Sequence, residues 1–257
     1  GDDRRPYLQI MEDGVPVTVW ENRPAESPSR IWFRRGTRPP VDVGRGDHPA
    51  LVLDRWGRAH VFFLRDDDIF YSKESSTQPG LFAHAANVTQ TPFILESAPT
   101  VGIHEKGRIF LCFERQGTLF LANDRTGDFS STVVVAEGGA GKPALVLSPN
   151  GAVGIAFEKA GDIYTTLGAT FFLPPAEPAF LTSEPESQPS IAVDSFANVF
   201  VGFQRGGALY YATNAGIPQA DFEADPLKGE APLTVSFLDR STGGVTGWSW
   251  DFGDGTS

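Results

Sequence analysis

The chain has 257 residues, 40% of them hydrophobic, and a formal net charge of −11. This charge argues against nucleic acid as a partner, because phosphate binding requires a basic face. No segment approaches the about 20 apolar residues that a membrane-spanning helix needs, so no membrane span is predicted. The only cysteine, Cys112, excludes an intrachain disulfide and lies in an apolar run, where we expect a buried structural thiol.

Five segments of fifteen residues align without a gap, and each begins at a proline. The prolines are Pro6, Pro49, Pro99, Pro143 and Pro189, which are 43, 50, 44 and 46 residues apart. Fourteen positions after them stand the aromatic residues Trp20, Phe63, Phe113, Phe157 and Phe203. A second set of aromatics follows a short turn and comprises Trp32, Phe70, Phe120, Tyr164 and Tyr210. A fixed period of this length indicates a repeat architecture.

Each repeat predicts three strands and a variable tail. In the second repeat these strands are Ala50–Leu53, Ala59–Phe63 and a segment around Phe70, with a turn at Gly57. The tail can add a fourth strand, as at 132–136 in the third repeat. Four-stranded units of about 40–50 residues are propeller blades, which bury their apolar faces against neighbouring blades. Residues 1–217 therefore predict a β-propeller, with five blades as the simplest count and a larger ring as the alternative.

The fifth repeat shows no obvious fourth strand. A strand from the N-terminus can complete such a blade by closing the ring. Only Gly1–Arg5 precede the first proline, and we expect these residues to be too few for a secure strand.

The sequence changes type at Pro218. The segments Ala231–Phe237, Asp239–Gly243 and Trp248–Gly255 resemble those of the PKD domain. The resemblance covers 218–257, about the first half of such a domain, and implies part of an immunoglobulin-like β-sandwich. Half a sandwich exposes an apolar face and unpaired edges. We therefore expect strands from further chain or from another subunit, and self-association through this half domain.

The fold class predicted for the whole chain is all-β, with a five-bladed or larger β-propeller followed by a partial PKD β-sandwich. The repeats resemble sialidase-like (BNR-type) propellers, in which proline, strand, Asp-x-x-Gly turn, strand and aromatic precede an Ile-Tyr-Tyr-Ala-type strand. The Asp-box of that family is degraded here: Asn123–Phe129 keeps an Asp, a Gly and an aromatic, and Ser72–Ser75 keeps little. The resemblance implies an extracellular or cell-surface location and recognition of a glycan or a protein.

Polar residues follow the first aromatic of each repeat. The pairs are Glu21-Asn22, Leu64-Arg65, Glu114-Arg115, Glu158-Lys159 and Gln204-Arg205. In a propeller this turn shares a face with the loops between blades, and that face commonly holds the site. The predicted ligand-binding residues are Arg4, Arg65, Glu114, Arg115, Glu158, Lys159 and Arg205. A ring of four cations, Arg65, Arg115, Lys159 and Arg205, can hold a carboxylate or a sulfate. The alternative is that each acid pairs with a neighbouring base.

Three functions stay open. The first is extracellular binding or adhesion. The second is a sialidase-like glycoside hydrolase, for which Arg4 matches the arginine of the family's Arg-Ile-Pro motif, while the remaining catalytic residues are unknown. Glu114 and Glu158 can act in a glycosidase of another type. The third is a structural component of a surface layer or filament.

No cofactor is expected from the sequence. Its four histidines are not spaced as metal ligands are. The acidic run Asp66–Asp68 can ligate Ca²⁺ through its oxygens, but a solvated turn is the simpler interpretation.

Overall fold

The computed structural model describes residues 2–91, 94–124, 129, 131–148, 151–169, 173, 176–179, 183–194, 198–213, 220–241 and 247–250. These residues form β-strands, turns and loops, and no α-helix is found among them. In the same part of the chain, no helix is long and apolar enough to cross a membrane. The fold is all-β, as predicted.

Each repeat forms one antiparallel sheet whose strands follow one another in chain order. The first sheet contains β1 (Asp2–Ile10), β2 (Pro16–Arg23), β3 (Arg30–Arg35) and β4 (Val41–Arg45). The second contains β5 (Asp47–Leu53), β6 (Ala59–Arg65), β7 (Asp68–Lys73) and β8 (Ala86–Asn87). The third contains β9 (Glu96–Ile103), β10 (Ile109–Arg115), β11 (Thr118–Asn123) and β12 (Thr132–Ala136). The fourth contains β13 (Gly141–Leu147), β14 (Ala152–Lys159), β15 (Asp162–Ala169) and β16 (Glu177–Pro178), and the fifth contains β17 (Glu186–Val193), β18 (Val199–Arg205) and β19 (Ala208–Thr213).

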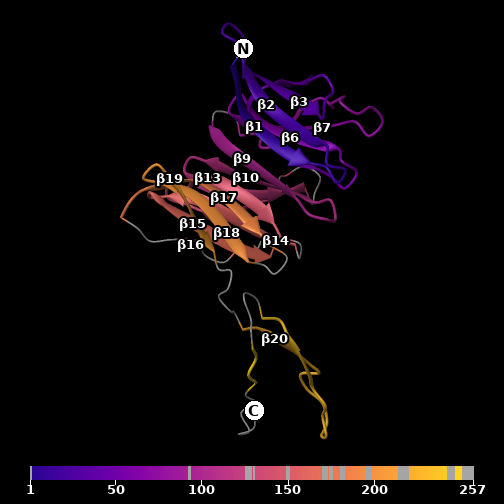
Figure 1. The fold of residues 1–257 in the computed structure, drawn as a ribbon, viewed down its shortest axis with the longest axis vertical. Helices are drawn as coiled ribbons and strands as arrows, with labels where there is room; N and C mark the ends of the chain where they lie inside the picture. Colours follow the sequence, from indigo (N-terminus) through magenta and orange to yellow (C-terminus); the bar gives the residue numbers. More distant parts are fainter. Residues whose placement is uncertain are drawn as a thin grey trace.

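The sheets stack in chain order, because the first strand of each sheet packs on the sheet before it. Thus β5 packs on β1 and β2, β9 on β5 and β6, β13 on β9 and β10, and β17 on β13 and β14. The first and fifth sheets lie at opposite ends of this stack (Figure 1), and no extensive packing joins them among the described strands. The described sheets therefore form an open stack, and the number of blades in a closed ring stays a prediction.

The N-terminus differs from expectation. Residues 2–5 belong to β1, and Asp2 to Arg4 pair with β2 in register. The prediction that Gly1–Arg5 are too few for a strand is therefore wrong. Their strand is part of the first sheet and does not complete the fifth. A bulge between Arg4 and Tyr7 separates this short stretch from the rest of β1.

The repeat aromatics form the same cross-strand pair in four sheets. Ring centroids lie 6.3 Å apart in Phe63–Phe70, 5.7 Å in Phe113–Phe120, 5.9 Å in Phe157–Tyr164 and 6.0 Å in Phe203–Tyr210. The first aromatic of each of these pairs is buried, whereas Trp20 in the first sheet is half-buried. The equal geometry of the pairs confirms the predicted repeat.

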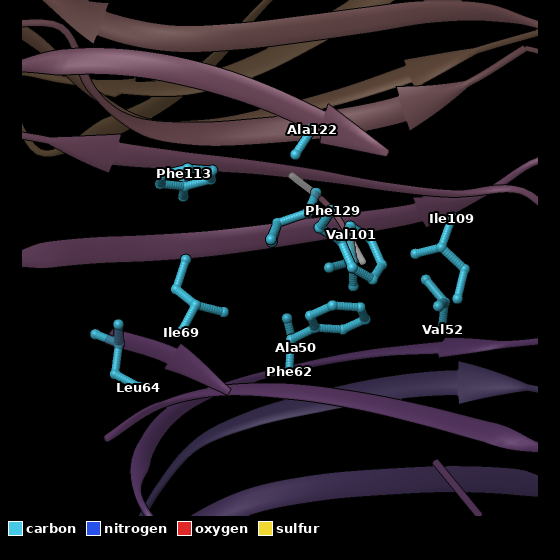
Figure 2. Close-up of a cluster of buried hydrophobic side chains, with 11 residues drawn as sticks. Ala50, Val52, Phe62, Leu64, Ile69, Val101, Ile109, Phe113, Ala122 and Phe129 are labelled. Carbon is cyan, nitrogen blue, oxygen red and sulfur yellow. The ribbon is translucent and has the colours of Figure 1, made fainter. Parts of the chain in front are cut away.

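Further apolar side chains fill the spaces between sheets. Figure 2 shows the cluster that joins the second and third sheets, in which Phe62 and Ile69 meet Val101 and Phe113. Phe129 contacts Phe62 edge to face, with 5.3 Å between ring centroids. Cys112 is buried in the next cluster, between the third and fourth sheets, as predicted.

The turns between the second and third strands are two-residue hairpins with positive φ at both positions in four sheets. The turn pairs are Asp66-Asp67, Gln116-Gly117, Ala160-Gly161 and Gly206-Gly207. Two positive φ angles define the type I′ turn, whose twist matches that of the flanking strands. These turns place the residues that follow the first aromatic along one face of the stack.

The segment after the fifth sheet forms a two-stranded antiparallel sheet of β20 (Phe222–Asp225) and β21 (Ser236–Asp239). Phe222, Phe237 and Trp250 pack together there, with centroids 5.6–6.1 Å apart. Residues 214–219, 242–246 and 251–257, which carry much of the PKD-like sequence, lie outside the described part.

Candidate functional site

The four cations of the predicted ring lie over aromatic rings of their own sheets. The charged group of Arg65 is 3.5 Å from the centroid of Phe70, that of Arg115 is 5.1 Å from Phe120, that of Lys159 is 5.8 Å from Tyr164, and that of Arg205 is 4.0 Å from Tyr210. Cation–π contacts of this kind stabilise a partly exposed side chain by about 0.5–1 kcal/mol. Each predicted anion-binding cation therefore has a structural partner.

Two of these cations also bind buried carboxylates that the sequence reasoning missed. Arg115 forms an ion pair with Glu96 at 2.5 Å, and Arg205 forms one with Glu186 at 3.6 Å. Both glutamates stand three residues before a repeat proline, and this spacing is the signal that could have identified them. Both carboxylates are fully buried.

The predicted carboxylates Glu114 and Glu158 are also engaged. Glu114 accepts hydrogen bonds from the Ser97 hydroxyl and, at 2.9 Å, from the Gly117 N–H. Glu158 forms an ion pair with Lys142 at 2.9 Å. Glu158 also accepts the N–H of Gln188 from the next sheet at 2.7 Å.

Glu21 occupies the equivalent place in the first sheet, between Arg5 at 2.6 Å and Arg23 at 2.8 Å. Burial alone would raise the pKa of Glu21, but the hydrogen bonds and charges of the two arginines outweigh it and lower this pKa. Arg4, the other predicted residue on β1, is exposed and pairs with Asp2. Glu21 is thus held ionised, which does not suit the general acid of a glycosidase.

The acidic run at the β6–β7 turn points its carboxylates at different partners. Asp66 pairs with Arg45 at 2.5 Å. Asp68 is buried and accepts hydrogen bonds from Asn87 at 2.6 Å and from the Thr91 N–H at 2.9 Å. Among the described residues, no three His, Cys, Asp or Glu side chains converge as metal ligands.

The structure is hollowed on the opposite face of the stack, where the turns between the first and second strands of each repeat lie. A pocket of about 470 Å³ lies between the first two sheets. It is lined by Met11, Arg35, Arg38, Trp56, Gly57, Arg58, Glu74, Ser75, Ser76 and Pro79. A second pocket of about 520 Å³ shares Met11, Trp56 and Gly57 with it and extends to His104 and Glu105 of the third sheet. Trp56 therefore lies between two adjoining hollows.

Trp56 is held in place by a tight turn. The Asp54 carboxylate accepts the N–H of Trp56 at 3.0 Å and that of Arg58 at 2.9 Å. It also pairs with the Arg58 guanidinium at 2.6 Å. Burial raises the pKa of Asp54, but these hydrogen bonds outweigh it and lower this pKa. Gly57 completes the turn with a φ of +74°, and a Cβ at this position would meet Met11 at 2.6 Å.

The indole of Trp56 is 63% exposed and has guanidinium groups against it, with Arg55 at 4.1 Å and Arg58 at 4.5 Å from its ring centroid. Arg38, which lines the pocket beside it, forms no ion pair within the described part of the chain. The first pocket thus combines an exposed aromatic side chain on a hydrogen-bonded turn with guanidinium groups and two serine hydroxyls. The sequence feature that could have identified this site is a tryptophan between arginines in a turn, Arg55-Trp56-Gly57-Arg58.

The back of this pocket is a contact between sheets. Arg35 of the first sheet donates to the Gly57 carbonyl at 2.8 Å and to Glu74 at 2.5 Å. Glu74 also accepts the N–H of Ala59 at 2.9 Å, and Asp124 accepts that of Ile109 at the same distance. These two carboxylates belong to the segments Ser72–Ser75 and Asn123–Phe129, which carry the degraded Asp-box, and each fixes the start of the second strand. Residues 125–128 of that segment lie outside the described part.

No family model matches the sequence, and no curated protein matches it. Solved structures are similar in fold. An ulvan lyase, described as a new family of polysaccharide lyase and bound to -[GlcA(1-4)Rha3S]-, is 11% identical with a TM-score of 0.56, over 83% of this chain and 73% of that one. An α-L-arabinofuranosidase of Podospora anserina, in complex with cellotriose, is 10% identical with a TM-score of 0.53, over 82% and 88%. A protein of unknown function from Dyadobacter fermentans is 12% identical with a TM-score of 0.54, over 78% and 74%.

The chain has a β-propeller-type fold. At identities of 10–12% these likenesses concern the fold alone. The sialidase-like origin of the repeats and the PKD identity of 218–257 stay predictions.

Proposed function

We propose that this chain is a glycan-binding propeller that takes an acidic sugar at the pocket beside Trp56. The observation that carries the proposal is the exposed indole of Trp56, on the turn that Asp54 holds, beside a pocket in which Arg38 forms no ion pair among the described residues. The apolar faces of sugar rings pack on aromatic side chains, and guanidinium groups bind carboxylate or sulfate through paired hydrogen bonds. A cationic pocket on a chain of net charge −11 favours a ligand with a negative group.

The fold neighbours support a carbohydrate ligand. Two of them are the α-L-arabinofuranosidase, solved with cellotriose, and the ulvan lyase, solved with -[GlcA(1-4)Rha3S]-. The resemblances of the repeats and of 218–257 support a location outside the cell or at its surface. In this proposal the PKD-like segment serves as a spacer or docking unit. Binding without turnover is favoured because Glu21, Glu114 and Glu158 each hold a structural partner.

The test is titration calorimetry with uronate-containing or sulfated oligosaccharides and with neutral ones of the same length. We expect the acidic ligands to bind, with affinity that falls as salt rises. Trp56→Ala and Arg38→Ala should each weaken binding at least about tenfold, which corresponds to about 1.4 kcal/mol. Trp248→Ala, which removes another exposed tryptophan, is the matched control.

Equal binding by wild type and Trp56→Ala would refute the site. Release of reducing ends or unsaturated products during the titration would refute the non-catalytic function. In that case Glu114→Gln and Glu158→Gln would test the predicted carboxylates for a role in turnover.

A further inference from the structure

One position of the repeat is buried in four sheets and exposed in the fifth. It is the residue immediately before the second aromatic, which is Ile31, Ile69, Leu119, Ile163 or Leu209. The first four have no exposed surface, whereas Leu209 is 88% exposed. Its neighbour Tyr211 is 75% exposed. The fifth sheet therefore presents an uncovered copy of a surface that is covered in every preceding sheet.

The first strand of the following sheet covers this position in the other four. The residue two places after each repeat proline packs in the same cluster as the buried position: Leu51 with Ile31, Val101 with Ile69, Leu145 with Leu119, and Ile191 with Ile163. In two cases a carboxylate completes the contact. Glu96 accepts the N–H of Ile69 at 3.2 Å, and Glu186 accepts that of Ile163 at 3.1 Å.

The strand β1 has the same features, and no other described sheet packs extensively on its side away from β5. Leu8 stands two places after Pro6 and is 57% exposed, and Ile10 is 59% exposed. Asp3 stands three places before Pro6, where Glu96 and Glu186 stand relative to their prolines. Asp3 is bound by Asn22 at 2.6 Å, as Glu96 is by Arg115, and both partners stand sixteen places after the repeat proline.

We propose that the fifth sheet of one copy binds β1 of a second copy, so that copies associate head to tail. In this contact Leu8 of the second copy covers Leu209, and Asp3 of the second copy accepts the N–H of Leu209. The occupant is a second copy because the chain itself supplies both complementary surfaces, and because these lie at opposite ends of its own stack (Figure 1). A contact between two different surfaces builds rings or open filaments of copies.

Sedimentation velocity over a concentration series tests this, at about 0.15 M salt so that the acidic chains repel each other little. We expect the mass of wild type to rise with concentration. Leu209→Asp and Leu8→Asp should each raise the dissociation constant at least tenfold, and both variants should fold because the wild-type side chains are exposed. Leu227→Asp, at an 86% exposed leucine outside the two sheets, is the control and should not change it.

Disulfide trapping identifies the partner surface. An Asp3→Cys protein mixed with a Leu209→Cys protein should form a covalent dimer, while Cys112 stays unreactive because it is buried and its pKa is raised. A disulfide within one chain of the Asp3→Cys/Leu209→Cys double variant would overturn the proposal in favour of ring closure. A monomer at all concentrations, or association that survives Leu209→Asp and is lost on deleting 218–257, would also overturn it.

Discussion

The carboxylate of Glu186 accepts the backbone N–H of Ile163, a residue of the preceding sheet, at 3.1 Å. On its other side it pairs with Arg205 of its own sheet at 3.6 Å. Glu96 repeats the arrangement with Ile69 and Arg115. A buried side chain thus joins one sheet to the next on the face of the stack where the sequence predicts a ligand site.

The first prediction concerns this link. Glu96→Ala should lower the free energy of unfolding by about 3–5 kcal/mol, because it removes the buried carboxylate that pairs with Arg115 and one of the two acceptors of the Ile69 N–H. Urea unfolding at pH 7 measures the change. Glu105→Ala, at an exposed glutamate, should stay within about 0.5 kcal/mol of wild type. A loss under 1 kcal/mol for Glu96→Ala would mean that the link does not hold the sheets together.

The repeat and its strands could be predicted because each sheet buries the same aromatic against its neighbour. A burial requirement that recurs at a fixed period leaves a pattern in the sequence, as at Phe63 and Phe113. The open stack could not be predicted from this pattern, since the same pattern suits a sheet with or without a neighbour. The exposed surface of Leu209 distinguishes the two cases.

The candidate site was harder to predict. The polar residues after the first aromatic recur in each repeat and attract attention, but recurrence here reflects a structural role, as the stacking of Arg65 on Phe70 shows. No tryptophan stands at the equivalent turn position of the other repeats, so the repeat pattern does not mark Trp56. Its significance depends on the hollow formed by residues distant in sequence, such as Arg38 and Ser76. Tertiary packing creates that hollow, and a single sequence does not reveal it.

The second prediction concerns pH. His60 is buried 2.8 Å from the Tyr71 hydroxyl. Burial, and then the charge of Lys73, lower its pKa from 6.5 to about 4. Below pH 6.5 the unfolded chain therefore binds a proton at His60, whereas the folded chain binds this proton only when the pH falls to about 4. Stability is fully present above pH 6.5 and should fall by on the order of 3 kcal/mol as pH drops to about 4.

Thermal unfolding between pH 7 and pH 4.5 measures this dependence. His60→Phe should flatten it, and phenylalanine suits the position because Phe110 and Phe200 occupy it in the third and fifth repeats. His84→Gln, at an exposed histidine, should leave it unchanged. An equal pH dependence in wild type and His60→Phe would assign the effect to other groups.

The third prediction uses the hairpin turns. Asp67 has a φ of +71°, while Gly117, Gly161 and Gly207 stand at the same position of the other turns. Asp67→Gly should stabilise the chain by about 0.5–1 kcal/mol, because the left-handed conformation costs an L-residue roughly 1–2 kcal/mol and glycine gives part of this back as unfolded-state entropy. The reciprocal Gly161→Asp should destabilise the chain by a similar amount because of the positive φ at this position. No clash adds to this cost, since a Cβ there meets only open space. The turn assignment would be contradicted if both substitutions shifted the urea midpoint in the same direction, or if Asp67→Gly lowered it and Gly161→Asp raised it.

The fourth prediction compares two equivalent leucines at protein concentrations low enough to keep copies apart. Leu119→Ala should cost about 2–5 kcal/mol, because it removes a fully buried side chain from the space between the third and fourth sheets. Leu209→Ala removes the same side chain from an open surface and should stay within about 0.5 kcal/mol of wild type. Urea unfolding of both variants decides the matter. If Leu209→Ala were as costly as Leu119→Ala at such dilution, the fifth sheet would have to be covered within a single chain, and the stack would be a closed ring in solution.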